Sequence, residues 1–149
     1  MKDRGHIVTC FDVNKDTVRS HLEGVSTIDD VKDHMLEGID FTFDPCQITE
    51  SEVFVICVPT PVTEKKLPDL TIVKKVKEML MQVAKPGSLI VLESTVGVGD
   101  TRRTFSDMVE MGFYVANSPE RIDPARKFPT LQDIPKVVGG VDEMSTKKP

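Results

Sequence analysis

Short apolar runs alternate with segments of helical periodicity along this chain, a pattern typical of an α/β domain with a parallel sheet. Strands are predicted at 7–11, 40–43, 53–58, 88–92, 113–116 and 136–138. Every residue of 53–58 and 89–92 is apolar. We therefore expect these two segments to be adjacent parallel strands, buried on both faces.

Capping residues and glycines mark the helices between these strands. Asn14 is placed to cap a helix that ends at Gly24. Asp69 is placed to cap a second helix, which ends at Pro86 and Gly87. Asp100 is expected to cap a third helix that ends near residue 111. A Gly139–Gly140 turn should follow the last strand, with no further element after it. The sequence thus predicts one domain, residues 1–149.

The bulk composition narrows the function classes. Of 149 residues, 39% are apolar and 29% charged, as in ordinary globular proteins, and the net charge of −5 argues against nucleic-acid binding. No apolar run reaches the length of a membrane helix, and the first residues do not read as a signal peptide. Cys10, Cys46 and Cys57 lack metal-ligand spacing, so no metal is expected, and Cys10 and Cys57 should be buried. These features favour a reducing, cytoplasmic location.

Polar residues follow several predicted strands, where a doubly wound domain binds its ligand. Asp12 could accept hydrogen bonds from the adenosine ribose of NAD and repel the extra phosphate of NADP, or it could be a local cap. Thr60, between two prolines, could contact a cofactor or belong to a rigid turn. Glu120 could act as an acid or base with Arg121 as an anion ligand, or the two could form a solvated ion pair.

The loop at residues 93–99 carries two hydroxyls and two glycines before a predicted helix. Such a loop can hold a phosphate or an ordered water, although two glycines alone are a weak signal. Thr95 lies at its start and is our candidate there.

Five motifs occur in one order and together carry a family resemblance. The chain, from about Gly5 to Gly140, resembles the NAD-binding domain of the UDP-glucose/GDP-mannose dehydrogenase family. Glu93, Arg121 and Ile122 are more similar to the branch that oxidises UDP-N-acetylhexosamines. The motifs are Val58-Pro59-Thr60-Pro61, Pro68-Asp69-Leu70, Glu93-Ser94-Thr95-Val96, Ser118-Pro119-Glu120-Arg121-Ile122 and Pro135-Lys136-Val137-Val138-Gly139-Gly140.

The resemblance implies oxidation of a sugar C6 hydroxyl to a carboxylate in two NAD-dependent steps. It implies two Rossmann-like domains joined by a long helix, a UDP-sugar substrate and a homo-oligomer for the full-length protein. For the cofactor, the resemblance implies that Asp12 binds the adenosine ribose, that Thr60 contacts the dinucleotide and that Thr95 lies near the nicotinamide and the reacting centre. For the substrate, it implies that Glu120 handles water or a proton and that Arg121 and Ile122 contact the sugar nucleotide.

The chain also departs from the family. Members open with a strand and a Gly-x-Gly-Tyr-Val-Gly-like loop, and no G-x-G-x-x-G pattern occurs here. We therefore expect a Rossmann-like, doubly wound parallel sheet that lacks its first strand and glycine-rich loop. The family's nucleophilic cysteine and catalytic lysine lie in later regions, and none of the three cysteines fits the nucleophile's motif. Ala125 stands where similar sequences tend to have glycine, and its methyl would disturb a loop of positive φ.

Two functions from different classes follow. The first is part of an NAD-dependent UDP-sugar 6-dehydrogenase, inactive as this chain alone. The second is a non-catalytic nucleotide- or sugar-nucleotide-binding remnant that assembles with a partner chain. A third reading, a hydroxyisobutyrate-type dehydrogenase, is disfavoured by the Glu-Ser-Thr and Pro-Glu-Arg motifs.

Overall fold

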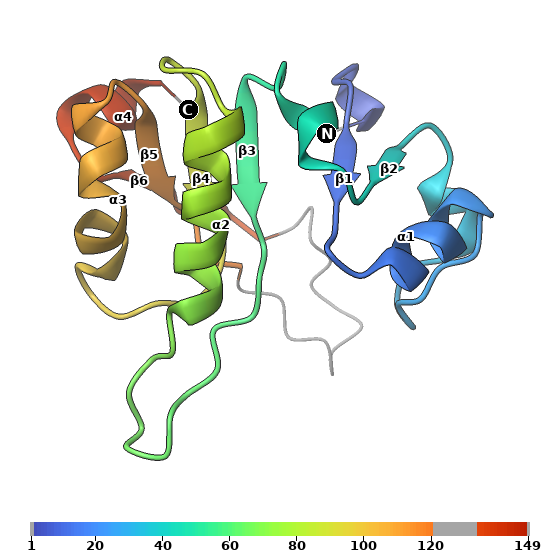
Figure 1. Cartoon of the computed structure of the whole chain (residues 1–149), viewed down its shortest axis with the longest axis horizontal. Coiled ribbons are helices and arrows are strands. Elements are labelled where there is room, and N and C mark those ends of the chain that lie inside the picture. The colour runs from blue at the N-terminus through green and yellow to red at the C-terminus, as the bar shows by residue number, and fades with distance from the viewer. Residues whose placement is uncertain (1, 121–133, 149) are drawn as a thin grey trace. The chain divides into compact units, whose positions relative to one another are not determined.

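The chain forms two compact units, each described here by itself. They are residues 1–50, the first unit, and residues 51–149, the second unit. The computed structural model describes residues 2–120 and 134–148 (Figure 1). Both units are α/β in character, and their sheets are mostly parallel, as the alternating sequence pattern predicts.

The first unit contains a two-stranded parallel sheet and short helical segments. Strand β1 pairs in parallel with β2, with Thr9 opposite Asp40. Helix α1 begins where the sequence predicts, because the Asn14 side chain accepts hydrogen bonds from the backbone N–H groups of Asp16 and Thr17. In chain order the elements are the 3-10 helix Lys2–Arg4, β1 (Thr9–Phe11), α1 (Lys15–Leu22), the 3-10 helix Asp33–Leu36, β2 (Asp40–Thr42) and the 3-10 helix Pro45–Ile48.

The second unit is built on a four-stranded sheet in the order β3-β4-β5-β6. Strands β3 (Val53–Ile56), β4 (Leu89–Leu92) and β5 (Tyr114–Asn117) run parallel, and β6 (Gly139–Gly140) is antiparallel to β5. Helix α2 (Thr71–Val83) connects β3 to β4, and α3 (Asp100–Glu110) connects β4 to β5. The predicted adjacency of β3 and β4, their parallel direction and the crossover helix are all confirmed.

The core of the second unit lies between this sheet and its helices. Leu80 from α2 and Phe105 from α3 are at most 2% exposed, because the apolar face of each helix is turned inward. The other buried apolar residues of this core include Val73, Ile90, Leu92, Met108, Phe113 and Val115. The packing of two helices on buried strands fixes where the strand ends lie, and these ends carry the polar residues considered below.

The prediction that β3 is buried on both faces is wrong. Within the described residues β3 pairs only with β4, so it is an edge strand. Phe54 and Ile56 are buried, but Val53 and Val55 are 45% and 39% exposed on the opposite face. Strand β4 is the central strand that the pattern predicts, with three buried residues of four. An apolar run therefore indicates a strand without indicating how many neighbours it has.

The end of the chain also differs from prediction. Residues 136–138 are not a strand, and the two glycines form β6 instead of a turn. Helix α4 (Glu143–Lys147) follows, capped by the Asp142 side chain on the backbone N–H of Ser145 at 2.6 Å. A Cβ at Gly140 would lie 2.3 Å from the backbone nitrogen of Thr146. Glycine is needed there because α4 packs directly on the strand backbone.

The start of α3 gives a further correction. Gly99, with φ +82°, occupies the N-cap position that we expected Asp100 to hold, and Asp100 is the first helical residue. Its carboxylate instead folds back and accepts from the backbone N–H of Gly97 at 2.8 Å. The loop before α3 is therefore closed by a side chain of the protein itself.

Candidate functional site

The candidate site lies where three parallel strands of the second unit end together. Ile56, Leu92 and Asn117 are opposite one another in the ladder. The backbone N–H of Glu93 then donates to the carbonyl of Ile56, and that of Ser118 to the carbonyl of Leu92, both at 2.9 Å. The three loops that leave β3, β4 and β5 therefore start side by side, as expected for the ligand edge of a parallel sheet.

Two hydroxyl groups join the loop after β3 to the loop after β4. The Thr60 hydroxyl donates to the Thr95 carbonyl at 2.7 Å, and the Ser94 hydroxyl donates to the Val58 carbonyl at 2.6 Å. Thr60 and Thr95, which the sequence analysis selected separately, are thus brought together. The Thr95 side chain is exposed, whereas Ser94 is buried. These reciprocal bonds connect the two loops at the strand ends, next to the exposed side chain of Thr95.

A cluster of charged side chains adjoins these loops. The Lys136 ammonium lies 3.0 Å from a carboxylate oxygen of Glu93 and 2.8 Å from one of Glu120. Partial burial alone would lower the pKa of Lys136, but hydrogen bonds from its ammonium to Glu120 and Glu93 raise this pKa above its ordinary value. The Cys57 sulfur lies 4.0 Å from the second carboxylate oxygen of Glu93. We call Cys57, Glu93, Glu120 and Lys136 the strand-end cluster.

Sequence reasoning found Glu120 but missed Lys136. The pattern assigned Lys136 to a strand and made Arg121 the partner of Glu120. Arg121 and Ile122 lie outside the described residues, as does Ala125. Lys136 follows Glu120 by 16 positions, so no local spacing links the two. The signal available in the sequence was its place in the Pro-Lys-Val-Val-Gly-Gly motif.

Asp12 lies in the first unit, directly after β1. Its carboxylate accepts a hydrogen bond from the backbone N–H of Asn14 at 2.8 Å, and its side chain is exposed. This contact is the local turn that we considered as the alternative to ribose binding. One carboxylate oxygen accepts this bond, which is compatible with a second bond to a ligand. The assignment of Asp12 to a cofactor stays a prediction.

The three cysteines are all exposed, so the expectation that Cys10 and Cys57 are buried is wrong. Cys10 lies on β1, which pairs with β2 alone among the described strands, and Cys57 follows the edge strand β3. Partial burial still raises the pKa of the Cys10 thiol. The pKa of the Cys46 thiol is also raised, chiefly by the nearby carboxylate of Asp44. Neither thiol is in the electropositive setting that activates a nucleophilic cysteine.

The N-terminus of α3 does not offer the open phosphate site that its two glycines suggested. The Asp100 carboxylate already occupies this position, on the Gly97 N–H, and is paired with Arg103 at 2.6 Å. A Cβ at Gly97 would lie 2.6 Å from a carboxylate oxygen of Asp100. Gly97 is therefore explained by its contact with Asp100, and a phosphate here would have to displace a carboxylate.

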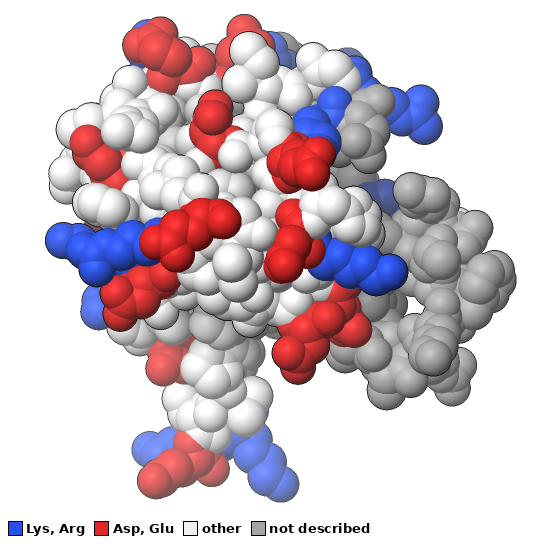
Figure 2. Space-filling view, turned by 90° about the vertical axis from the view of Figure 1, so that its right-hand side faces the viewer, with Lys and Arg blue, Asp and Glu red and all other residues white. Residues whose placement is uncertain are grey.

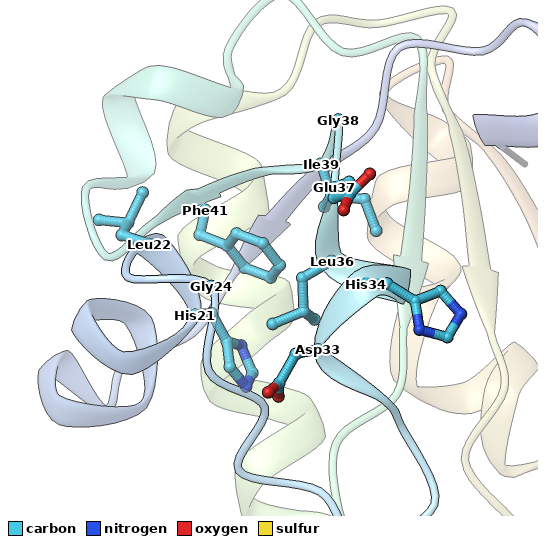
Figure 3. Close-up of a pocket in the computed structure, with 10 residues that line it drawn as sticks. All are labelled: His21, Leu22, Gly24, Asp33, His34, Leu36, Glu37, Gly38, Ile39 and Phe41. Carbon is cyan, nitrogen blue, oxygen red and sulfur yellow. The ribbon is translucent and has the colours of Figure 1, made fainter.

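A hollow of about 400 Å³ lies in the first unit, and its lining includes none of the residues proposed for the site. Figure 3 shows His21 and Asp33 directed toward one another near Leu36 and Phe41, with His34 pointing away. The His21 ring contacts Thr27 at 3.0 Å and packs on Phe41, and Asp33 accepts from the backbone of Ser26. These polar groups are engaged in their own turns, so the hollow is explained as local structure.

The described residues also show how charged and apolar side chains are distributed. Acidic and basic side chains are interspersed on the face drawn in Figure 2, unlike the continuous basic surface that a phosphate backbone requires. Within residues 2–120 and 134–148, every helix falls short of the length and apolarity of a membrane span. In the same residues, His, Cys, Asp and Glu do not gather in a group of three able to hold a metal ion.

Parallel strands joined by helices, with polar loops gathered at the strand ends, define the class of α/β nucleotide-binding proteins. The sequence profile of the UDP-glucose/GDP-mannose dehydrogenase family, NAD binding domain, matches residues 1–148. The chain belongs to this family. This membership decides against the hydroxyisobutyrate-type alternative.

Individual relatives are consistent with the predicted branch. The chain is 31% identical over 144 residues to UDP-N-acetyl-D-glucosamine 6-dehydrogenase of Pseudomonas aeruginosa, an alignment that covers 89% of this chain and 34% of the relative. It is 37% identical over 102 residues to UDP-N-acetyl-D-mannosamine dehydrogenase of Methanocaldococcus jannaschii, covering 66% and 24% of the two chains. The chain thus spans about a third or less of the length of these relatives.

A solved structure gives the same picture of the fold. UDP-D-ManNAc dehydrogenase from Pyrococcus horikoshii superposes with a TM-score of 0.83 at 26% identity, covering 96% of this chain and 37% of that one. The α/β fold therefore matches the Rossmann-like NAD-binding domains of nucleotide-sugar dehydrogenases.

Proposed function

We propose that these residues are part of an NAD-dependent dehydrogenase that oxidises the C6 hydroxyl of a UDP-N-acetylhexosamine to a carboxylate. The observation that carries the proposal is the junction of the β3 and β4 loops through Thr60 and Thr95, beside a carboxylate held by Lys136. The relatives named for UDP-N-acetylhexosamine oxidation support the substrate class.

The dinucleotide is proposed to bind at the strand ends. The exposed Thr95 side chain and the two cross-linked loops offer hydroxyl and backbone groups to a flat ligand. We assign Thr60 to the dinucleotide, Thr95 to the nicotinamide and reacting centre, and Asp12 to the adenosine ribose. When bound, NAD supplies the acceptor for a hydride. Arg121 and Ile122, assigned to the sugar nucleotide, remain proposals from the sequence.

Glu120 is the proposed proton-handling group. An ionised carboxylate can take a proton directly or through a water molecule, provided that it is held in place. Its bond to Lys136 meets this condition, because the ammonium restricts the orientation of the carboxylate. A cytoplasmic location and a homo-oligomeric full-length protein stay predictions.

The test measures NADH by absorbance with UDP-N-acetylmannosamine, UDP-N-acetylglucosamine and UDP-glucose in turn. A longer polypeptide that includes these residues should form two NADH per UDP-N-acetylhexosamine and little with UDP-glucose. Residues 1–149 alone should bind NAD weakly and form no NADH, because they correspond to about a third of the P. aeruginosa relative. Sustained turnover by residues 1–149, abolished by Cys46→Ser or Cys57→Ser, would overturn this expectation. Activity of the longer protein with UDP-glucose alone would overturn the substrate assignment.

A second candidate is a nucleotide-binding module that assembles with a partner chain and does no chemistry. The edge position of β3, with exposed Val53 and Val55, favours it, because an open strand edge can accept another strand. NAD binding without NADH formation by the longer polypeptide would select this candidate.

A further inference from the structure

We propose that Lys136 is a positioning residue of the strand-end cluster, which holds the carboxylates of Glu93 and Glu120 together and fixes the direction of Glu120. This inference rests on the proposed function, in which Glu120 handles a proton. Lys136 itself would not contact the reacting atoms.

The geometry places Lys136 between two carboxylates that would otherwise repel each other. The backbone N–H of Glu120 donates to the carbonyl of Glu93 at 3.2 Å, so the two residues are adjacent before their side chains are considered. The Lys136 ammonium then contacts one oxygen of each carboxylate, at 3.0 and 2.8 Å. An ammonium has three donors, so it can serve both acceptors at once. Without it, two like charges on neighbouring strand ends would turn away from one another.

The cluster crosses all three parallel strands of the sheet. Cys57 follows β3, Glu93 follows β4 and Glu120 follows β5 by three positions. The second oxygen of Glu93 lies 4.0 Å from the Cys57 sulfur. Glu93 directly follows the central strand β4 and is therefore the fixed centre of the row, and Lys136 ties Glu120 to that centre. A surface ion pair between two long side chains would have no such anchor.

The three charged side chains of the strand-end cluster are partly exposed, unlike those of a buried ion pair that only stabilises the fold. The side chains of Glu93, Glu120 and Lys136 are 23%, 36% and 38% exposed. Water and ligands can therefore reach the carboxylates while the ammonium restricts their rotation. Such access suits a group that must exchange a proton, whereas a bridge that only stabilises the fold gains nothing from it.

The first measurement uses the 149-residue chain and needs no activity. NMR titration of the Lys136 side chain should show a raised pKa that falls toward the ordinary value, about 10.4, in Glu93→Gln and in Glu120→Gln. Glu143→Gln is the matched control, because Glu143 pairs with Lys147 instead. A Lys136 pKa that neither of the first two substitutions lowers would overturn the proposal.

The second measurement uses a longer polypeptide that includes residues 1–149 and forms NADH. Lys136→Met keeps most of the side-chain length and removes the charge, so kcat should fall at least about tenfold while KM changes by less than about threefold. Lys136→Arg should restore most of kcat, and Lys147→Met should change neither constant. Equal kcat in Lys136→Met and the unmodified protein would overturn the positioning role. Absence of NADH formation by the unmodified protein would instead overturn the proposed function, and the titration would still decide whether Lys136 joins the two carboxylates.

Discussion

The candidate residues of the two units differ in how far away in the sequence their side-chain hydrogen-bond partners lie. In the first unit, Asp12 and Asn14 bond to backbone groups two or three positions away. In the second unit, the bonds of Thr60 and Ser94 span 35 and 36 positions. Short-range contacts are encoded in local sequence, whereas the strand-end cluster exists only once the sheet has formed.

The units also differ in how much apolar surface they bury. Val18, Leu36 and Ile48 are the buried apolar residues among the described part of the first unit. The second unit buries Val73 and Leu80 of α2, Phe105 and Met108 of α3, and three of the four residues of β4. Burial of apolar area is the main stabilising contribution to folding. We therefore expect the second unit to be the more stable one, and to support the site that depends on long-range contacts.

The largest expected effect is on the free energy of unfolding, and it compares the removal of one phenylalanine from each unit. Phe105→Ala removes a fully buried ring from the second unit and should cost about 3–5 kcal/mol of unfolding free energy. Phe43→Ala removes a ring that is 42% exposed and contacts Lys15 in the first unit, and should cost about 1 kcal/mol or less. Urea unfolding measures both. Equal costs would contradict the idea that the core lies in the second unit.

An intermediate effect concerns Asp12, the candidate of the first unit. The test uses a longer polypeptide that includes residues 1–149 and binds NAD measurably. Asp12→Ala should weaken its affinity for NAD about ten- to a hundredfold, or ~1.5–3 kcal/mol. The same substitution should reduce the preference for NAD over NADP. Asp12→Asn keeps an acceptor for the Asn14 N–H and so separates the turn from the ligand contact. Asp16→Ala, also exposed, is the control. Unchanged affinity in a calorimetric titration of Asp12→Ala would leave Asp12 as a turn residue only.

The smallest expected effect is the contribution of one ion pair in each unit to the stability of the fold. The hydrogen bond from Lys77 lowers the pKa of Asp107 against the opposing effect of burial, so this pair stabilises the fold above about pH 4, and the contribution is lost as pH falls through the lowered pKa. Because Asp107 is 46% exposed, Lys77→Met should cost only about 1 kcal/mol at neutral pH. Arg19→Gln, in the exposed Arg19–Asp16 pair of the first unit, should cost less than about 0.5 kcal/mol.

Thermal unfolding across pH checks this prediction. The difference between Lys77→Met and the unmodified chain should shrink as the pH falls below about 4 and should vanish once Asp107 is protonated in both proteins. A difference that stays constant down to pH 2 would show that the lysine acts through its aliphatic stem and not through its charge.

Local rules predicted much of the fold but little of the cluster. Periodicity found α1, α2 and α3, and the apolar runs found the parallel strands. Of the predicted caps, Asn14 is confirmed, whereas Leu70 and not Asp69 is the N-cap residue of α2. They could not show that β3 is an edge strand, because Val53 and Val55 are as apolar as the buried residues of β4. Lys136 was assigned to a strand because two valines follow it, and its partners are 43 and 16 positions away. Asp100 was misplaced by one residue, because a glycine of positive φ took the cap position.

The two glycines of β6 should differ in how well they tolerate substitution. An added Cβ at Gly139 meets no described atom within 4 Å, whereas at Gly140 it would enter the backbone of α4. In a saturation library, substitutions at position 139 should therefore survive selection for folding, and those at position 140 should be depleted with a severity that hardly depends on the new side chain. Two identical neighbouring letters would then give entirely different tolerance profiles, and a score based on residue type alone would misjudge one of them.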